Sequence, residues 1–184
     1  MTLRSITVAA VALASIRVGA GQPAPLELKG IMPGMSYSAF DARFPKICQA
    51  PDPQWETYQC DFAYTSELQS IAEQDVAGWT VNFIGSQIGS IGGVFKSGSF
   101  LSIRDSLIAK FGRPSSVKTS AVSNAHGAKF EQITVEWRRG GSLLMIQRYA
   151  STIDDGVFLL ASDRYIKRSA QIDAEKTRRR SKDL

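Results

Sequence analysis

The 184-residue chain is poor in the side chains that most often carry chemistry. Its one histidine, His126, stands in a segment, Asn124-Ala-His-Gly127, that is typical of a turn. A serine–histidine–aspartate site would have to use this histidine, yet no Gly-x-Ser-x-Gly elbow is present. A single histidine also makes a metal site a poor interpretation. We therefore predict no catalytic residues, no cofactor and no metal.

Nucleotide-binding loops are also absent from the sequence. The glycines at positions 85, 89, 92 and 93 lack the spacing of a dinucleotide fingerprint or a P-loop, and no Lys-Ser or Lys-Thr pair follows them. They suit bulges or close packing within a strand. Paired carboxylates need only be close in space and leave no motif, so a hydrolase with an unrecognised site stays open as an alternative.

Long apolar runs are missing beyond Ala20. Before it, a basic start at Met1–Arg4 leads into an apolar run, Ser5–Ile16, which is shorter than the roughly 20 residues that span a bilayer. Small residues at Val18-Gly19-Ala20 then match a signal-peptidase site. We predict a signal peptide over residues 1–20, cleaved near Ala20, and a periplasmic or secreted protein. The alternatives are an N-terminal membrane anchor and an apolar strand. No cysteine stands near the cleavage point, which argues against a lipid-modified signal.

Positive charge is concentrated at the C-terminus. Residues 21–162 carry 12 basic and 13 acidic side chains, whereas residues 163–184 carry eight basic and four acidic ones. We predict a single domain over residues 21–162, followed by a basic tail over residues 163–184. Arg178, Arg179 and Arg180 are candidate contacts for anionic lipid or lipopolysaccharide. The alternative is a solvated helix that keeps the protein soluble, and nucleic acid is an unlikely partner for an exported protein.

The two cysteines flank a loop-like segment that contains two prolines. In an oxidising compartment we expect Cys48 and Cys60 to form a disulfide, and the spacing is not that of a Cys-x-x-Cys redox site. Trp55 and Tyr58 lie in or beside this loop, where no periodic pattern demands their burial. They are candidate partner-binding residues, because tryptophan and tyrosine commonly anchor protein interfaces. The alternative for Trp55 is a lid over the disulfide.

Two segments have helical periodicity and seven have the character of strands. Tyr37, Phe40 and Phe44 predict a short helix that ends at Pro45, and 100–111 predicts a longer one with Ser99 as N-cap and Gly112 as stop signal. Strands are predicted at 59–64, 78–84, 88–95, 117–121, 129–138, 142–149 and 156–162, with hairpin turns at 123–127, 139–141 and 153–156. The expected fold class is α+β: an antiparallel sheet with two helices packed on one face.

The two helical segments have similar surroundings. Gly30-Ile-Met-Pro-Gly-Met-Ser36 precedes the first, and Gly93-Val-Phe-Lys-Ser-Gly-Ser99 precedes the second. This likeness predicts a duplicated helix-plus-strands unit over about residues 26–92 and 93–162.

These motifs resemble a known group of proteins. Gly34-Met35-Ser36 at a helix start, and Lys110-Phe-Gly-Arg-Pro114 at the end of a later helix, are similar to the BamE/SmpA-like envelope domains and to the related two-repeat fold of the β-lactamase inhibitor proteins. The resemblance covers roughly residues 26–165. It implies helices packed against an antiparallel sheet and a role in binding other proteins. The envelope proteins of that group carry a lipid on a cysteine and have one repeat, whereas this chain lacks such a cysteine and has two similar segments.

Together these patterns favour an exported, non-enzymatic protein-binding module of the cell envelope, whose partner is another envelope or secreted protein. The first alternative is an envelope-associated structural protein whose basic tail contacts anionic lipid or lipopolysaccharide. A row of aromatic side chains on the open sheet face would favour the binding module. A deep pocket with two converging carboxylates would favour the hydrolase.

Overall fold

The computed structural model describes residues 25–44, 46–48, 57–62, 68–124 and 126–181; for residues 46–48, 57, 58, 61 and 62 it describes the backbone alone. The first half of the chain forms α1 (Tyr37–Asp41), β1 (Lys46–Cys48), β2 (Thr57–Phe62), β3 (Ser70–Ile71), β4 (Gln74–Ile84) and β5 (Gln87–Lys96). The second half forms a 3-10 turn η2 (Ser97–Ser99), α2 (Phe100–Phe111), β6 (Ser116–Ser123), β7 (Lys129–Arg139), β8 (Ser142–Gln147), β9 (Asp155–Ser162) and α3 (Asp163–Arg180). The signal-peptide prediction lies outside the described residues.

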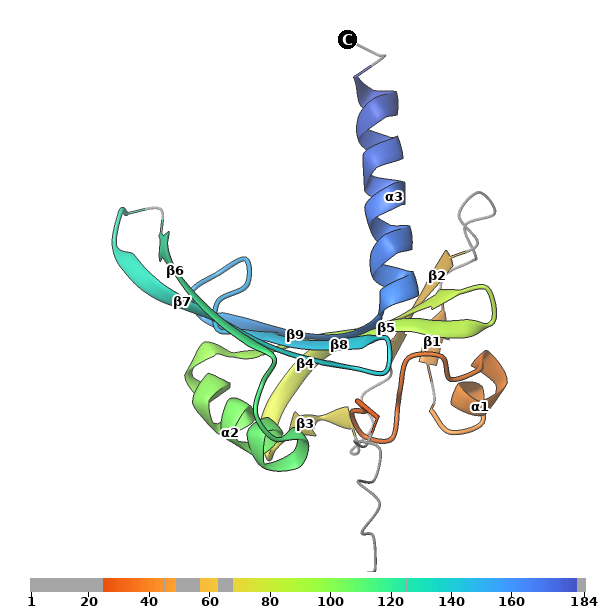
Figure 1. Cartoon of the computed structure of the whole chain (residues 1–184), viewed down its shortest axis with the longest axis horizontal. Helices are drawn as coiled ribbons and strands as arrows, with labels where there is room; N and C mark the ends of the chain where they lie inside the picture. The colour runs from red at the N-terminus through yellow and green to blue at the C-terminus, as the bar shows by residue number, and fades with distance from the viewer. Residues whose placement is uncertain (1–24, 45, 49–56, 63–67, 125, 182–184) are drawn as a thin grey trace, which may run out of the picture.

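The strands build one antiparallel sheet from two meanders. Their order is β1-β2-β4-β5-β9-β8-β7-β6, with β3 paired to β4 off this path, and each described pairing is antiparallel. Each meander follows a helix, α1 or α2, and both helices lie on the same side of the sheet (Figure 1). The predicted α+β class with an antiparallel sheet is therefore confirmed.

The hairpin turns explain why neighbouring strands pair in sequence order. Gly140 and Gly141 have φ values of 53° and 74°, which the tight turn between β7 and β8 requires and glycine adopts readily. Between β6 and β7, Asn124 Oδ1 accepts hydrogen bonds from the amides of His126 (3.0 Å) and Ala128 (2.9 Å). The predicted turns at both places are confirmed.

A third tight turn carries no such sequence signal. The sequence of residues 66–75 is polar and partly helical in pattern, yet β3 and β4 form a hairpin within this segment, in which Ser70 pairs with Asp75. Its two turn residues, Ala72 and Glu73, adopt positive φ values of 52° and 62°. Neither residue type favours the left-handed region, so propensity gives no warning of this turn.

The helices differ from their predictions at two points. Helix α1 ends at Asp41, before Phe44, because Phe44 precedes Pro45 and a residue in that position is disfavoured in helical conformation. Phe44 is still buried, 5.3 Å from Phe40 between ring centroids. Ser99 stands at the N-cap of α2 but makes no capping hydrogen bond; its hydroxyl donates to Gln74 Oε1 at 2.8 Å instead.

The core lies between the helices and the sheet. Helix α2 contributes a continuous stripe of four buried side chains at helical spacing, Phe100, Ile103, Leu107 and Phe111. They join buried residues of β4, β5, β7, β8 and β9 in a single cluster. Trp79 and Trp137 are both buried, as their strand positions predict, and Trp137 Nε1 donates to the Gly112 carbonyl at 2.9 Å. Among the helices that the structure describes, none is long and apolar enough to cross a membrane.

The two meanders meet where β5 pairs with β9, at reciprocal glycine–phenylalanine contacts. Gly93 lies opposite Phe158, and Phe95 lies opposite Gly156. A Cβ atom on Gly93 would be 2.5 Å from Phe158 Cε1, and one on Gly156 would be 2.3 Å from Phe95 Cε2. Each ring therefore covers the glycine across from it, and Trp79 adds an edge contact to Phe158 at 4.8 Å.

This junction also reveals a repeated sequence. Gly93-Val94-Phe95 and Gly156-Val157-Phe158 are identical tripeptides, and Val94 pairs with Val157, so each copy lies opposite the other. Gly30-Ile31-Met32 is a third, similar copy, and the three are equally spaced along the chain. At the same interval after each glycine stand Ser36, Ser99 and Ser162, the N-caps of α1, α2 and α3. The predicted repeat boundary between residues 92 and 93 thus falls inside β5.

We expect Gly156→Ala to lower the free energy of unfolding by about 1–3 kcal/mol, because the added methyl group has no room beside Phe95 and the Gln147 carbonyl. Urea denaturation of the purified protein measures this. Gly98→Ala is the matched control, since nothing lies within 4 Å of its Cβ position, and it should change stability by less than about 0.5 kcal/mol. Equal stability of the two variants would contradict the packing at this junction.

Candidate functional site

The sheet face opposite α1 and α2 is concave and is the side from which α3 rises (Figure 1). Alternate residues of a strand point to opposite faces, so the neighbours of the buried core residues face this side. At its centre lie four half-buried aliphatic side chains, Val94, Met145, Val157 and Leu159. Val94 pairs with Val157 and Met145 with Leu159, which makes the four contiguous. We call them the apolar floor.

The charged groups around the apolar floor are matched in pairs. Lys96 Nζ lies 2.8 Å from Asp155 Oδ1, and Lys118 Nζ lies 3.5 Å from Glu136 Oε1. The hydrogen bond from Lys96 and a second one from Thr152 hold the pKa of Asp155 below its usual range. Because each of these two cations has an anion beside it, the pairs add little net charge to the rim of the concave face.

The base of α3 is fixed to the sheet by several contacts. Ser162 caps the helix by accepting from the Tyr165 amide at 3.1 Å, and the Asp163 amide donates to the Gly141 carbonyl at 2.8 Å. The Tyr165 ring rests on Gly89, where a Cβ atom would lie 2.6 Å from Tyr165 Cδ2. Gly89 stands at a register shift between β4 and β5. This bulge and the missing side chain let the first turn of α3 approach the sheet closely.

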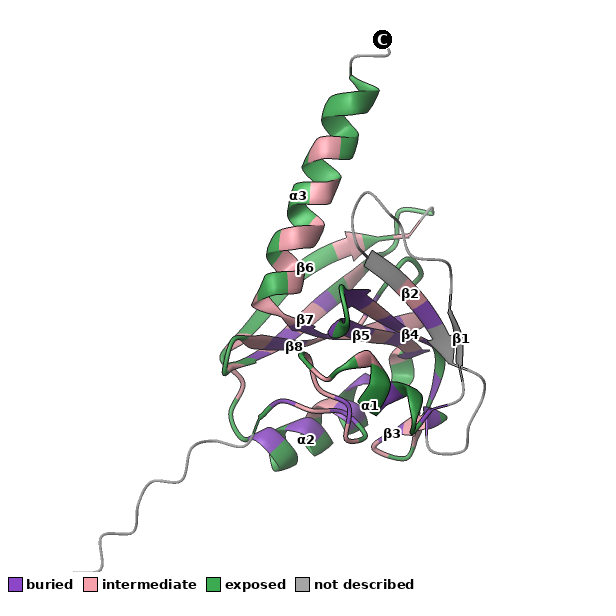
Figure 2. Ribbon diagram, turned by 90° about the vertical axis from the view of Figure 1, so that its right-hand side faces the viewer, coloured by how far each residue is buried: buried purple, intermediate pink, exposed green. Residues whose placement is uncertain are grey.

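Beyond its first turns α3 is uncovered. None of its residues is buried, and it extends away from the sheet as a mostly exposed helix (Figure 2). Eighteen residues correspond to about 27 Å of helix. It carries seven basic and three acidic side chains, whereas the apolar floor and its rim are nearly neutral. The segment predicted as a basic tail thus forms the helix α3 over residues 163–180.

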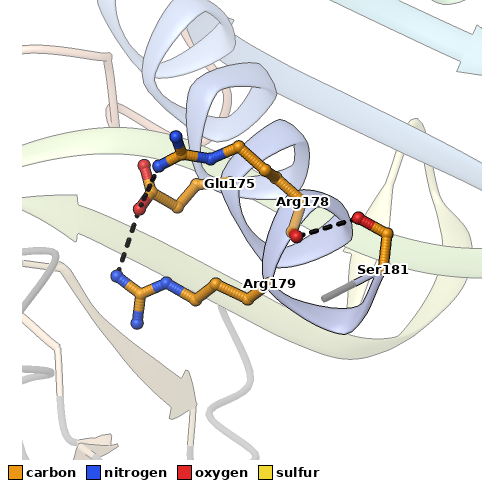
Figure 3. A network of polar contacts seen from close by, with 4 residues as sticks. All are labelled: Glu175, Arg178, Arg179 and Ser181. Atoms are coloured by element: carbon orange, nitrogen blue, oxygen red, sulfur yellow. Dashed lines mark hydrogen bonds and ion pairs between the residues drawn. The ribbon is translucent and has the colours of Figure 1, made fainter. Parts of the chain in front are cut away.

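Two of the three candidate anionic-surface contacts already have a carboxylate partner. Arg179 Nη2 lies 3.1 Å and Arg178 Nη2 lies 3.2 Å from Glu175 Oε1 (Figure 3). The hydrogen bonds from Arg179 and then Arg178 hold the pKa of Glu175 below its usual range. Cations near the C-terminus also suit the helix dipole. Arg178, Arg179 and Arg180 thus help to stabilise the last turn, and all three stay exposed at the outer end of α3.

The cysteine segment lies at the far edge of the sheet. Cys48 of β1 is directly opposite Cys60 of β2, and Cys60 is buried and disulfide-bonded. Opposed residues of an antiparallel pair have Cα atoms about 4.5–5.5 Å apart, within the range that a disulfide bridges. Trp55 lies outside the described residues. Tyr58 is placed in β2, and its side chain is not described.

The described strands carry no row of aromatic side chains at the centre of the concave face, although such a row would favour a binding face. The apolar floor is aliphatic, and the aromatic rings of β4, β5 and β9 point into the core. At the β7 end, Phe130 is half-buried and Tyr149 is buried, and their ring centroids lie 6.0 Å apart. The floor was missed because Val94, Met145, Val157 and Leu159 have the same composition as core residues, and sheet order decides which face they occupy.

A hollow of about 400 Å³ brings two carboxylate residues to one place, at Asp75 and Asp155. Lys96 also lines it, and its ammonium holds Asp155 in the ionised form. A general acid needs a raised pKa, so Asp155 is not suited to that role. His126 is exposed in the β6–β7 turn. No cluster of three potential metal ligands occurs among the residues that the structure describes.

No protein-family model, no curated protein and no solved structure matches this chain. The resemblance to BamE/SmpA-like domains therefore stays a prediction.

The Lys96–Asp155 contact predicts a shifted titration. Asp155 should titrate below the usual range of aspartate, and Lys96→Met should move its pKa upward, because the ammonium that stabilises the carboxylate is gone. A carboxyl group whose pKa is lowered by folding stabilises the folded state at pH values above the pKa that the same group has in the unfolded chain. That contribution is lost as pH falls through the folded value, so the contact stabilises the protein at neutral pH and not in acid. Carboxyl NMR titration of both proteins measures the shift; identical Asp155 curves would contradict the contact.

Proposed function

We propose that the protein is an exported, non-enzymatic binding module of the cell envelope, and that it holds another protein against its concave face. The observation that carries this proposal is the apolar floor of Val94, Met145, Val157 and Leu159, which no helix covers. Covering half-exposed aliphatic side chains stabilises a complex by roughly 25 cal/mol per Å² of apolar surface removed from water.

The form of the surface favours a protein over a small molecule. Small-molecule sites are usually enclosed clefts with a few converging polar groups. The apolar floor instead spreads over three neighbouring strands, β5, β9 and β8, and its rim consists of ion-paired side chains. An apolar centre with a polar rim is the usual anatomy of a protein interface.

The proposed architecture is a duplicated unit of one helix followed by a four-stranded meander. The identical Gly-Val-Phe segments and the equally spaced capping serines support it. Since β5 and β9 lie side by side and antiparallel, the two units are related by an approximate twofold axis that passes through the Val94–Val157 pair. The concave face is then a composite surface to which both units contribute.

Export to the periplasm or beyond is supported by the predicted signal peptide and by the disulfide-bonded Cys60. Disulfides persist in oxidising compartments and are rare in the reducing cytosol. The proposed partner is therefore an envelope or secreted protein.

The second candidate function is contact with anionic lipid or lipopolysaccharide through α3. The specific observation in its favour is the excess of basic residues on an uncovered helix whose tip carries Arg178, Arg179 and Arg180. Two of these arginines share Glu175, which reduces the charge available to a surface. The hydrolase alternative has in its favour only that Asp75 and Asp155 line one hollow.

Affinity capture from an envelope extract tests the proposal when matched variants are compared. Met145→Glu places a carboxylate in the apolar floor, where a partner would have to bury it, and should lower recovery of a specific protein at least tenfold. Ser106→Glu is the control, since it adds the same charge to an exposed position of α2 on the other side of the sheet. Reversal of Arg178, Arg179 and Arg180 to glutamate should leave recovery unchanged.

Two results would overturn the proposal. One is equal recovery by Met145→Glu and Ser106→Glu, which would place the partner elsewhere. The other is recovery of lipid or lipopolysaccharide alone, lost on charge reversal in α3, which would move the second candidate to first place.

A further inference from the structure

Exposed apolar side chains gather at one end of the molecule, far from the cysteine edge. Among the described residues, three large hydrophobic side chains are exposed: Leu101 at 54%, Ile108 at 37% and Val117 at 59%. Leu101 and Ile108 lie two turns apart on the outer side of α2. Val117 belongs to β6, the strand that follows α2 in the chain.

Strand β6 is an open sheet edge. It pairs with β7 over eight residues, from Ser116 with Glu136 to Ser123 with Lys129, without a register shift. Its other side has no neighbouring strand in the sheet order, so every second residue presents its N–H and C=O groups outward. The opposite edge of the sheet is formed by β1, a strand of three residues.

The usual protections of an edge strand are weak in β6. Its sequence, Ser-Val-Lys-Thr-Ser-Ala-Val-Ser, contains no proline and no glycine. Its one charge, Lys118, lies beside Glu136 of β7 at 3.5 Å. The strand is also exposed at most of its positions. It is therefore able to accept another strand.

The charges near this edge permit that strand to come from a second copy of this chain. Arg104 is paired with Asp105 at 2.8 Å, Lys110 with Glu27 at 2.8 Å, and Lys118 with Glu136. A twofold interface brings the same surface patch of both subunits together, so a patch of net charge would repel its own copy. The matched pairs on α2 and β6 reduce that repulsion, and the basic helix α3 lies on the side of the sheet opposite α2 (Figure 1).

We propose that β6 pairs antiparallel with β6 of a second copy of this chain, so that one sheet continues through both subunits. A twofold axis perpendicular to the sheet keeps both pairs of helices on one side and both concave faces on the other. Opposed residues must then point to the same face, which restricts the axis to pass through a residue.

The side chains favour an axis at Thr119. Val117 then lies opposite Ala121 of the second copy, and Lys118 lies opposite Ser120. An axis at Ser120 would instead place Lys118 against Val122 and Val117 against Ser123. The first register covers the exposed Val117 with an apolar neighbour and leaves each lysine beside its own Glu136. The outer faces of the two α2 helices, with Leu101 and Ile108, lie on the same side of the sheet as this contact.

Sedimentation equilibrium of the purified protein over a concentration series tests the proposal. We expect a reversible dimer. Val117→Asp should weaken it at least tenfold, or about 1.4 kcal/mol, because the interface would bury a carboxylate in each copy. Ser151→Asp adds the same charge to an exposed loop on a different part of the chain and should leave the dimer unchanged. Far-ultraviolet circular dichroism confirms that both variants fold.

Disulfide trapping tests the register itself. With the axis at Thr119, the two Thr119→Cys residues lie about 4.5–5.5 Å apart between Cα atoms, which a disulfide spans, and mild oxidation should give a covalent dimer. Ser123→Cys is the control, because its own copies would lie roughly 26 Å apart. A monomer at all concentrations would overturn the proposal. So would a dimer that Val117→Asp leaves intact, or equal cross-linking of the two cysteine variants.

Discussion

The contact on which the rest of the structure depends is the pairing of β5 with β9. These strands end the two meanders, and among the described strands theirs is the ladder that joins the two halves of the sheet. At the junction each Gly-Val-Phe segment places its ring over the glycine of the other, which excludes any side chain at Gly93 or Gly156. Phe95 and Phe158 thereby enter the same core that α1 and α2 cover. The two Gly-Val-Phe segments thus join the two meanders and contribute their rings to the core beneath the helices.

The same junction assigns different roles to the two faces of the sheet. Phe95 and Phe158 point into the core on the helix side of the sheet. Their neighbours Val94 and Val157 must therefore point to the concave side. Leu159 and Met145 extend them into the apolar floor. Helix α3 begins after Ser162, which follows Gly156 at the same interval as Ser99 follows Gly93, but it bears Asp163 where α2 has Phe100. None of its residues is buried, and it rises from the concave side, fixed at its base by contacts such as that of Tyr165 with Gly89.

Much of the fold follows from local patterns. Alternation and glycine turns predict β4 to β9 to within a few residues, and the stripe from Phe100 to Phe111 predicts α2 with its observed ends. The β3–β4 hairpin was missed because Ala72 and Glu73 are not turn formers. Helix α1 was predicted, but it ends at Asp41, earlier than Phe44, the last residue of its predicted stripe. The candidate site could not be predicted from local sequence patterns. Val94, Met145, Val157 and Leu159 become one surface only when β5, β9 and β8 are placed side by side. The equal spacing of Gly30, Gly93 and Gly156 was also visible in the sequence, but Gly156 and Ser162 fall in a segment that the two-unit prediction assigns to the end of a unit.

Native-state hydrogen exchange of the backbone amides of β5 and β9 tests this account most directly. If their pairing holds the two meanders together, the amides of Ile91, Val94, Val157 and Leu160 should be among the slowest to exchange. They should share one free energy of opening, equal to that of global unfolding. Exchange of β9 through a separate, lower-energy opening, while β5 stays protected within the first meander, would contradict the account. The two meanders would then be independent units in contact, and the concave face would not depend on their junction.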